Sequence, residues 1–174
     1  MKPSTGRAVF EAGLTLQAVQ VAEHQLTFAL TWIFPKDSNL RLYELYRMGA
    51  DLQKRTLGQL VRELRQRADI RPDFDSLLAD FIARRNRFAH SLFTEDDYLL
   101  ESDAGSARAT EFMLQLQDIS TQVDQALLGH LVQWGHTANV PGLREFTDSL
   151  LQRSPRLQQI KRTHEDVIRN SRSA

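Results

Sequence analysis

Hydrophobic and polar residues recur with a helical period along the chain, and no segment shows the two-residue alternation of a strand. The first apolar run, residues 8–34, carries two apolar stripes, and Pro35 ends it because a residue before proline avoids helical angles. A helix that is apolar on two sides is central to its bundle or buried against a partner chain. One stripe holds Phe10, Leu14, Val21, Phe28 and Trp32, and the other holds Val9, Leu16, Val19, Leu26 and Ile33.

Three further helices are predicted before the middle of the chain. Residues 40–53 repeat apolar positions at helical spacing. Thr56 and Gln59 have the spacing of a capping box, which predicts a short helix after them. Pro72 starts the next helix, residues 73–93, because proline is favoured at the first helical position. In the short helix, leucine and valine side chains face inward, and the side chains expected to face outward are Arg62, Arg65 and Arg67.

The second half of the chain begins with an acidic connection, residues 95–107, in which Tyr98, Leu99 and Leu100 could dock back on the bundle. A second long helix follows, capped by Ser106 or Thr110, and it ends near Trp134 with Gly135 as its stop. Two weaker helices are predicted at residues 143–153 and 156–170. The pattern therefore predicts an all-α, up-and-down bundle of four to five helices over residues 1–136, with a C-terminal helical extension over residues 137–174 packed on the same domain.

Composition narrows the class of protein. The 174 residues, 41% of them hydrophobic, suffice for one well-formed core. Cysteine is absent, which excludes disulfides and thiolate chemistry and fits a reducing compartment. Residues 1–7 lack the apolar core of a signal peptide, and no run of about 18 apolar residues occurs. We therefore expect a soluble, cytoplasmic protein that makes no membrane contact.

Charge is balanced overall but unevenly placed. The formal net charge is zero, which excludes a globally basic nucleic-acid binder. Residues 54–90 hold nine basic and five acidic residues, whereas residues 91–125 hold eight acidic residues and one arginine. Arginine supplies most of the basic charge, and its planar guanidinium suits bidentate phosphate contacts. Solvated helix faces and an acidic loop account for most of these charges.

The helix at residues 73–93 places an arginine where apolar residues are expected. On a helical wheel Arg85 falls near the middle of the apolar arc, where a guanidinium is costly unless it is paired or opens into a polar cavity or interface. Asn86 and His90, four residues apart, share one edge of this helix. The apolar arc holds Leu77, Leu78, Phe81, Ile82, Phe88, Ala89, Leu92 and Phe93.

The six residues 85–90, Arg-Asn-Arg-Phe-Ala-His, resemble the R-x(4–6)-H motif of the HEPN superfamily. These all-α domains include many metal-independent ribonucleases of bacterial toxin and defence systems. The similarity extends to the polar residue directly after the arginine, here Asn86, and to the surrounding apolar positions. It covers residues 8–134 in outline, and Arg85, Asn86 and His90 carry its specific part.

The resemblance implies a homodimer in which two motifs face each other, and a metal-independent endoribonuclease that needs no cofactor and leaves 2′,3′-cyclic phosphate ends. By the family pattern His90 handles protons, Arg85 holds the scissile phosphate, and Asn86 orients the phosphate or His90. Arg84 and Arg87 are candidate contacts to the RNA backbone. An antitoxin or another defence protein would be its partner. The alternative is a catalytically silent HEPN-like domain for dimerisation or partner binding.

Other candidate chemistry is sparse. A structural alternative for Arg85 is that its side chain reaches from the core to an acidic partner while His90 is an ordinary surface residue. His130 and His136 are six residues apart, which does not bring them to one helix face, so structural or surface roles are expected rather than metal binding. The same holds for His24 and His164. The chain has no HExxH, no glycine-rich phosphate loop and no GxSxG.

Overall fold

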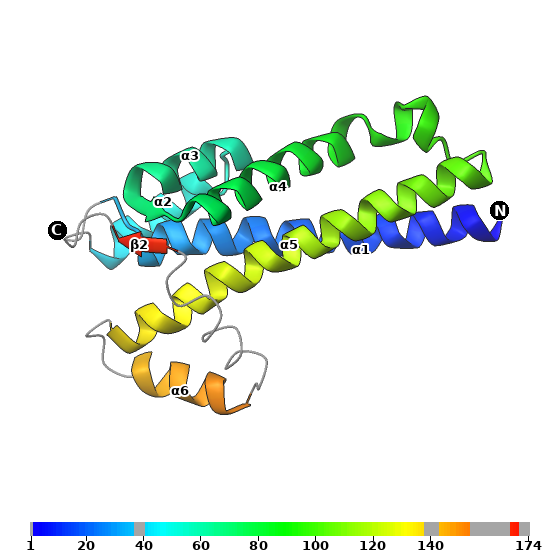
Figure 1. The fold of residues 1–174 in the computed structure, drawn as a ribbon. Coiled ribbons are helices and arrows are strands. Elements are labelled where there is room, and N and C mark those ends of the chain that lie inside the picture. The colour runs from blue at the N-terminus through cyan, green and yellow to red at the C-terminus, as the bar shows by residue number, and fades with distance from the viewer. Residues whose placement is uncertain (1, 37–40, 138–142, 154–167, 171–174) are drawn as a thin grey trace. The chain divides into compact units, whose positions relative to one another are not determined.

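The computed structural model describes residues 2–36, 41–137, 143–153 and 168–170. It is an all-α helical bundle, as predicted, with α1 (Pro3–Phe28), α2 (Leu42–Leu52), α3 (Leu57–Arg67), α4 (Pro72–His90), α5 (Asp103–Thr137) and α6 (Leu143–Arg153) (Figure 1). A π-helical turn, η1 (Ala29–Ile33), extends α1, and 3-10 turns occupy η2 (Leu92–Thr94) and η3 (Asp96–Tyr98). None of the described helices is both long enough and apolar enough to cross a membrane.

The chain forms two compact units, and three helices contribute to both. Unit 1 comprises residues 1–23 and 76–123, and unit 2 comprises residues 24–75 and 124–174. In unit 1 the N-terminal parts of α1 and α5 run side by side (Figure 1). Gln117 donates to the carboxylate of Glu11 and to the hydroxyl of Thr15, both at 3.0 Å, so polar bonds as well as apolar burial join these helices. The core side chains of unit 1 include Val19, Leu78, Phe81, Leu92, Met113, Leu116 and Val123.

Several predicted helix boundaries are confirmed. Thr56 caps α3 by accepting from the backbone of Gln59, whose side chain accepts in turn from the backbone of Thr56. Pro72 is the first residue of α4. The π-helical turn stops at Ile33, two residues before Pro35. The acidic connection docks through Tyr98, whose ring meets Phe112 edge-on at 6.1 Å.

The boundaries of α5 differ from the prediction at both ends. The helix begins at Asp103, and the residue that caps it is Ser102, which accepts from the backbone of Gly105 at 2.9 Å. Ser106 and Thr110, the two predicted caps, are buried inside the helix. Gly135 does not end α5 either, since the helix continues to Thr137. This glycine instead allows close packing, because a Cβ there would lie 2.3 Å from Thr147 Cγ2 of α6.

Arg67 was expected to face outward, and it is buried, with 5% of its surface exposed. Its Nη1 donates to the carbonyl oxygens of Leu30 and Phe34, both at 2.9 Å, and its Nη2 donates to Glu63 at 2.6 Å. The carbonyls at the end of a helix lack partners within the helix, so a buried arginine can satisfy them. Arg67 therefore joins α3 to the end of η1.

A short antiparallel ladder is the exception to the all-α architecture. Residues 156–170 were predicted to be helical, but β2 (Ile168–Asn170) pairs with β1 (Ala68–Ile70). The backbone is already extended at Ala68, where φ is −136° and ψ is 147°. Three residues are too few to show a two-residue alternation, so the sequence pattern did not indicate these strands. The remainder of that predicted helix lies outside the described residues.

Candidate active site on helix α4

Arg85 is held by an acidic residue, which is one of the possibilities that the apolar arc of α4 left open and the one that its structural alternative named. Its Nε donates to Glu23 Oε1 of α1 at 2.7 Å, and the side chains of Arg85 and Glu23 are 28% and 26% exposed. The guanidinium is thus neither buried in the core nor fully in solvent. Its Nη2 has no hydrogen bond within the described part of the chain, so this nitrogen can still donate to a ligand.

Asn86 and His90 line the exposed edge of α4 beside Arg85. The Nη1 of Arg85 donates to Asn86 Oδ1 at 3.3 Å, so these two residues are in contact. His90 lies four residues after Asn86, one helical turn on, and is exposed. Its imidazole makes no hydrogen bond or ion pair with any described residue, including Arg85 and Asn86. The structure therefore joins Arg85 to Asn86 and leaves the imidazole of His90 exposed beside them.

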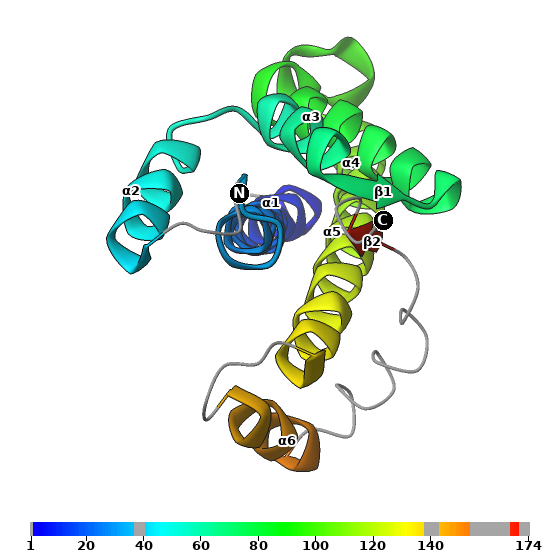
Figure 2. The same ribbon diagram turned by 90° about the vertical axis from the view of Figure 1, so that its left-hand side faces the viewer.

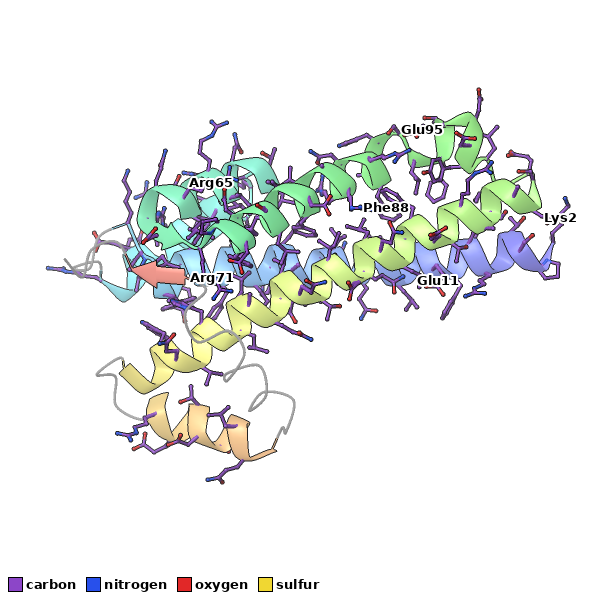
Figure 3. The ribbon with its side chains drawn as sticks, in the orientation of Figure 1. Lys2, Glu11, Arg65, Arg71, Phe88 and Glu95 are labelled. Atoms are coloured by element: carbon purple, nitrogen blue, oxygen red, sulfur yellow. The ribbon has the colours of Figure 1, made fainter. Side chains whose placement is uncertain are left out.

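Arg84 and Arg87, the candidate RNA contacts, both have partners inside unit 1. Arg84 donates to Asp80 at 2.9 Å and to Gln115 Oε1 of α5 at 2.9 Å. Arg87 donates to Glu95 from Nε at 3.1 Å, and Glu95 lies in the segment that follows α4 (Figure 3). Either guanidinium would have to share or leave these partners to bind a phosphate.

Arg87 organises the segment that follows α4. Its guanidinium carbon lies 4.7 Å from the ring centre of Tyr98 and 5.2 Å from that of Phe112, within the range of cation–π attraction. The hydrogen bond from Arg87 lowers the pKa of Glu95, and the same bond raises the pKa of Arg87. These contacts give Arg87 a structural role that its place on a polar helix edge did not indicate.

Glu23 is the residue of this site that the sequence prediction missed. Val9, Leu16 and Glu23 are spaced by seven residues, so they lie along one side of α1. Glu23 interrupts an apolar series just as Arg85 interrupts the apolar arc of α4. One acidic and one basic residue, each interrupting an apolar series on its own helix, could have predicted that Glu23 and Arg85 form an ion pair.

The side of α1 that carries Glu23 also exposes apolar residues. Val9 is 51% exposed and Leu16 is 50% exposed. We call Val9 and Leu16 the α1 strip. The strip is in line with Glu23, which lies two turns beyond Leu16 and binds Arg85. Ala89 of α4, predicted to face the core, is exposed as well.

The remaining histidines do not add to the site. His130 is largely buried and stacks on Phe34 with ring centres 5.0 Å apart, which confirms a structural role. Burial lowers its pKa from 6.5 to about 4. His24 is exposed on α1, and the side chains of His136 and His164 lie outside the described residues. Among the described residues, no group of three histidine, aspartate or glutamate side chains is arranged to hold a metal ion.

Comparison of the chain with protein-family models, with curated proteins and with solved structures gives no match.

Proposed function

We propose that the chain is a metal-independent endoribonuclease of toxin or defence type, with Arg85, Asn86 and His90 as its catalytic residues. The observation that carries the proposal is the contact of Arg85 with Asn86 beside an exposed His90 that has no partner in the described structure. This combination offers a cation with a free edge, an orienting amide and a titratable group on one helix. By the motif resemblance, the chain would act in the cytoplasm and cleave RNA as part of a defence system.

The chemistry requires two proton transfers and one charge stabilisation. The ribose 2′-oxygen attacks phosphorus after losing its proton, and the bond to the 5′-oxygen breaks as that oxygen gains a proton. The products are a 2′,3′-cyclic phosphate and a 5′-hydroxyl. Histidine suits the proton transfers near neutral pH. Arg85 stabilises the charged phosphorane through its free edge, and Asn86 holds Arg85 in place.

A two-fold dimer would supply the second histidine that the two proton transfers need. One exposed histidine beside Arg85 cannot be both the base that accepts the first proton and the acid that is already protonated. A second copy, with its α4 facing the first, brings a second His90 to the same phosphate. The α1 strip is in line with Glu23, which binds Arg85, and burying the strip in such a dimer removes apolar surface from water.

The cleavage assay uses His90→Ala, because His90 is exposed and its loss leaves the core unchanged. Wild type and variant are incubated with chelator and a panel of RNAs that includes transfer and messenger RNA. We expect wild type to leave cyclic-phosphate ends. The variant lacks His90 in both copies of the dimer, so it should lose activity by at least about 10²–10⁴-fold, the contribution of one acid–base group. Equal cleavage by both proteins would assign the activity to another site or to a contaminant.

The dimer is tested separately by light scattering at micromolar concentration. We expect wild type to have the mass of two chains and Leu16→Asp to have the mass of one. Phe10→Asp is the matched control, because Phe10 is an exposed apolar residue of α1, 65% exposed, that lies off the α1 strip. A wild-type mass of one chain would contradict the dimer, and so would an equal loss of dimer in both variants.

The second candidate function is a catalytically silent helical domain that dimerises or binds a partner such as an antitoxin. The ion pair between Arg85 and Glu23 favours it, because a carboxylate at 2.7 Å already neutralises the cation that a phosphate would need. Absence of cleavage across the RNA panel, with the dimer intact, would establish this candidate in place of the first.

A further inference from the structure

A pocket in unit 2 is lined by residues of the end of α1, of η1 and of α2, and none of them belongs to the proposed catalytic site. Its volume is about 340 Å³ and its walls include the aromatic rings of Phe28, Trp32 and Tyr46. Ligand pockets span roughly 300–1,000 Å³. A pocket at the lower end of this range has room for one or two side chains and is too small for a large cofactor.

The floor of the pocket depends on a close approach of α2 to the π-helical turn. A Cβ at Gly49 would lie 3.3 Å from both Cγ2 and Oγ1 of Thr31, so glycine is what lets α2 pack this closely on η1. Thr31 is buried and its hydroxyl donates to the Thr27 carbonyl at 2.8 Å, which fixes the floor. α2 lies at the edge of unit 2, apart from α3 (Figure 2).

The aromatic walls form a corner. The rings of Trp32 and Tyr46 meet edge-to-face with centres 5.6 Å apart and an interplanar angle of 87°. Phe28 continues the wall 6.2 Å from Trp32. Tyr46 is 64% exposed, and Tyr43, one turn earlier on α2, is 73% exposed. An edge-to-face pair leaves ring surface uncovered, and Trp and Tyr in such a setting are the residues that dominate binding at protein interfaces.

The segment that contains α2 carries a small excess of basic residues. The segment of residues 41–55 carries Arg41, Arg47, Lys54 and Arg55 against Glu44 and Asp51. Lys54 lies 3.7 Å from Asp51, and Arg55 lies 2.8 Å from Glu63 of α3. Arg47, adjacent to Tyr46, is exposed and forms no ion pair with any described residue. This charge excess complements an acidic ligand and disfavours a cationic one.

We propose that this pocket is a docking site for an acidic peptide segment of a partner protein, which inserts one apolar anchor side chain between Trp32 and Tyr46. Acidic residues flanking the anchor pair with Arg47, the basic residue of α2. The anchor supplies the affinity, because fully desolvated aromatic contacts carry most of the energy of such interfaces. The charges raise the rate of association and select the partner. The site stands whether or not the chain cleaves RNA.

The test is selection of random peptides displayed on phage against the full-length chain. We expect the enriched sequences to share one large apolar residue flanked by aspartate or glutamate. A synthetic peptide of the enriched sequence should bind Tyr46→Ala at least about 30-fold more weakly than wild type, the loss typical of a central interface residue. Tyr43→Ala is the matched control, since it removes an equally exposed tyrosine of α2 that does not line the pocket.

A second variant guards against a simple folding defect in Tyr46→Ala. Ala50 is exposed and lines the pocket, so Ala50→Leu fills the mouth without removing any contact of the core. It should abolish peptide binding, and Arg47→Glu should slow association. The proposal would be overturned if the enriched peptides were basic or lacked an apolar residue. It would also be overturned if Tyr43→Ala and Tyr46→Ala weakened peptide binding equally. Binding of single-stranded RNA to wild type but not to Ala50→Leu would overturn it as well, because it would assign the pocket to nucleic acid.

Discussion

Each unit contains an arginine and a histidine that the sequence analysis singled out, and the two pairs differ in how far their side chains are buried. In unit 2, Arg67 is 5% exposed and donates to the Phe34 carbonyl, while His130 stacks on the Phe34 ring. In unit 1, Arg85 keeps 28% of its side chain exposed, and His90 is exposed without a partner among the described residues. The first pair stabilises the fold, whereas the second pair has donors available for a ligand. This difference is why we propose Arg85 and His90, and not Arg67 and His130, as functional residues.

The largest expected effect is that of Arg67→Met on stability. Removing the guanidinium leaves the carbonyls of Leu30 and Phe34 without this donor inside unit 2. Glu63 loses one of its two arginine partners. Loss of one partner of a buried ionic contact typically costs about 3–5 kcal/mol. Urea unfolding followed by circular dichroism measures it, with Arg62→Met, an exposed arginine of the same helix, as control. A loss as small as that of the control would show that Arg67 is dispensable.

Acid should destabilise the fold through His130. Burial depresses its folded-state pKa to about 4, below the 6.5 of the unfolded chain, so unfolding takes up a proton below pH 6.5. Stability is therefore full above pH 6.5 and falls as the pH drops toward 4, by at most about 3 kcal/mol. Urea unfolding at pH 7.5 and 5 measures the loss. His130→Phe should flatten this dependence, and His90→Ala should leave it unchanged.

Arg85→Met should cost far less stability than Arg67→Met. Both members of the pair with Glu23 are partly exposed, and such pairs contribute about 1 kcal/mol or less. Methionine also restores the apolar arc of α4. The same urea experiment measures the change in the free energy of unfolding. A loss of stability equal to that of Arg67→Met would make Arg85 a structural residue. The two arginines would then no longer differ in role.

His90→Ala should have the smallest effect on stability. The imidazole is exposed and has no hydrogen bond to a described residue, so its removal should change the free energy of unfolding by no more than about 0.5 kcal/mol. Thermal unfolding of His90→Ala beside wild type measures it. A clear loss of stability would reveal a contact of His90, for instance across a dimer interface, and this would appear as dependence on protein concentration.

The sequence predicted the starts of α3 and α4 because their capping and proline signals are local. Thr56 with Gln59, and Pro72, act through backbone groups within one turn, and both predictions are confirmed. The predicted inward face of α4 holds for Leu78 and Phe81, which are buried, and Leu92 of η2 is buried as well. Predictions failed where a distant neighbour decides. The role of Gly135 follows from its close contact with Thr147. The burial of Arg67 follows from its hydrogen bonds to carbonyls more than thirty residues away in the sequence.

The candidate site was also predictable only where the signal lies within one helix. Arg85 was recognised because its charge breaks the apolar arc of its own helix, and its acidic partner was expected without being identified. The contact with Glu23 depends on how α1 and α4 pack, which helical spacing alone does not give. The partners of Arg87 depend on the path of the segment after α4, which brings back Glu95 and Tyr98. The roles of Arg85, Asn86 and His90 in catalysis stay predictions.

The rate of RNA cleavage by Arg85→Met relative to wild type tests the central claim most directly. Both proteins are assayed with chelator at a temperature where circular dichroism shows each to be fully folded. Removing one group that stabilises charge in the transition state typically lowers the rate about 10²–10³-fold. We predict a loss of this size, with cyclic-phosphate ends from wild type. Cleavage by folded Arg85→Met at the wild-type rate would contradict the assignment of Arg85 as a catalytic residue.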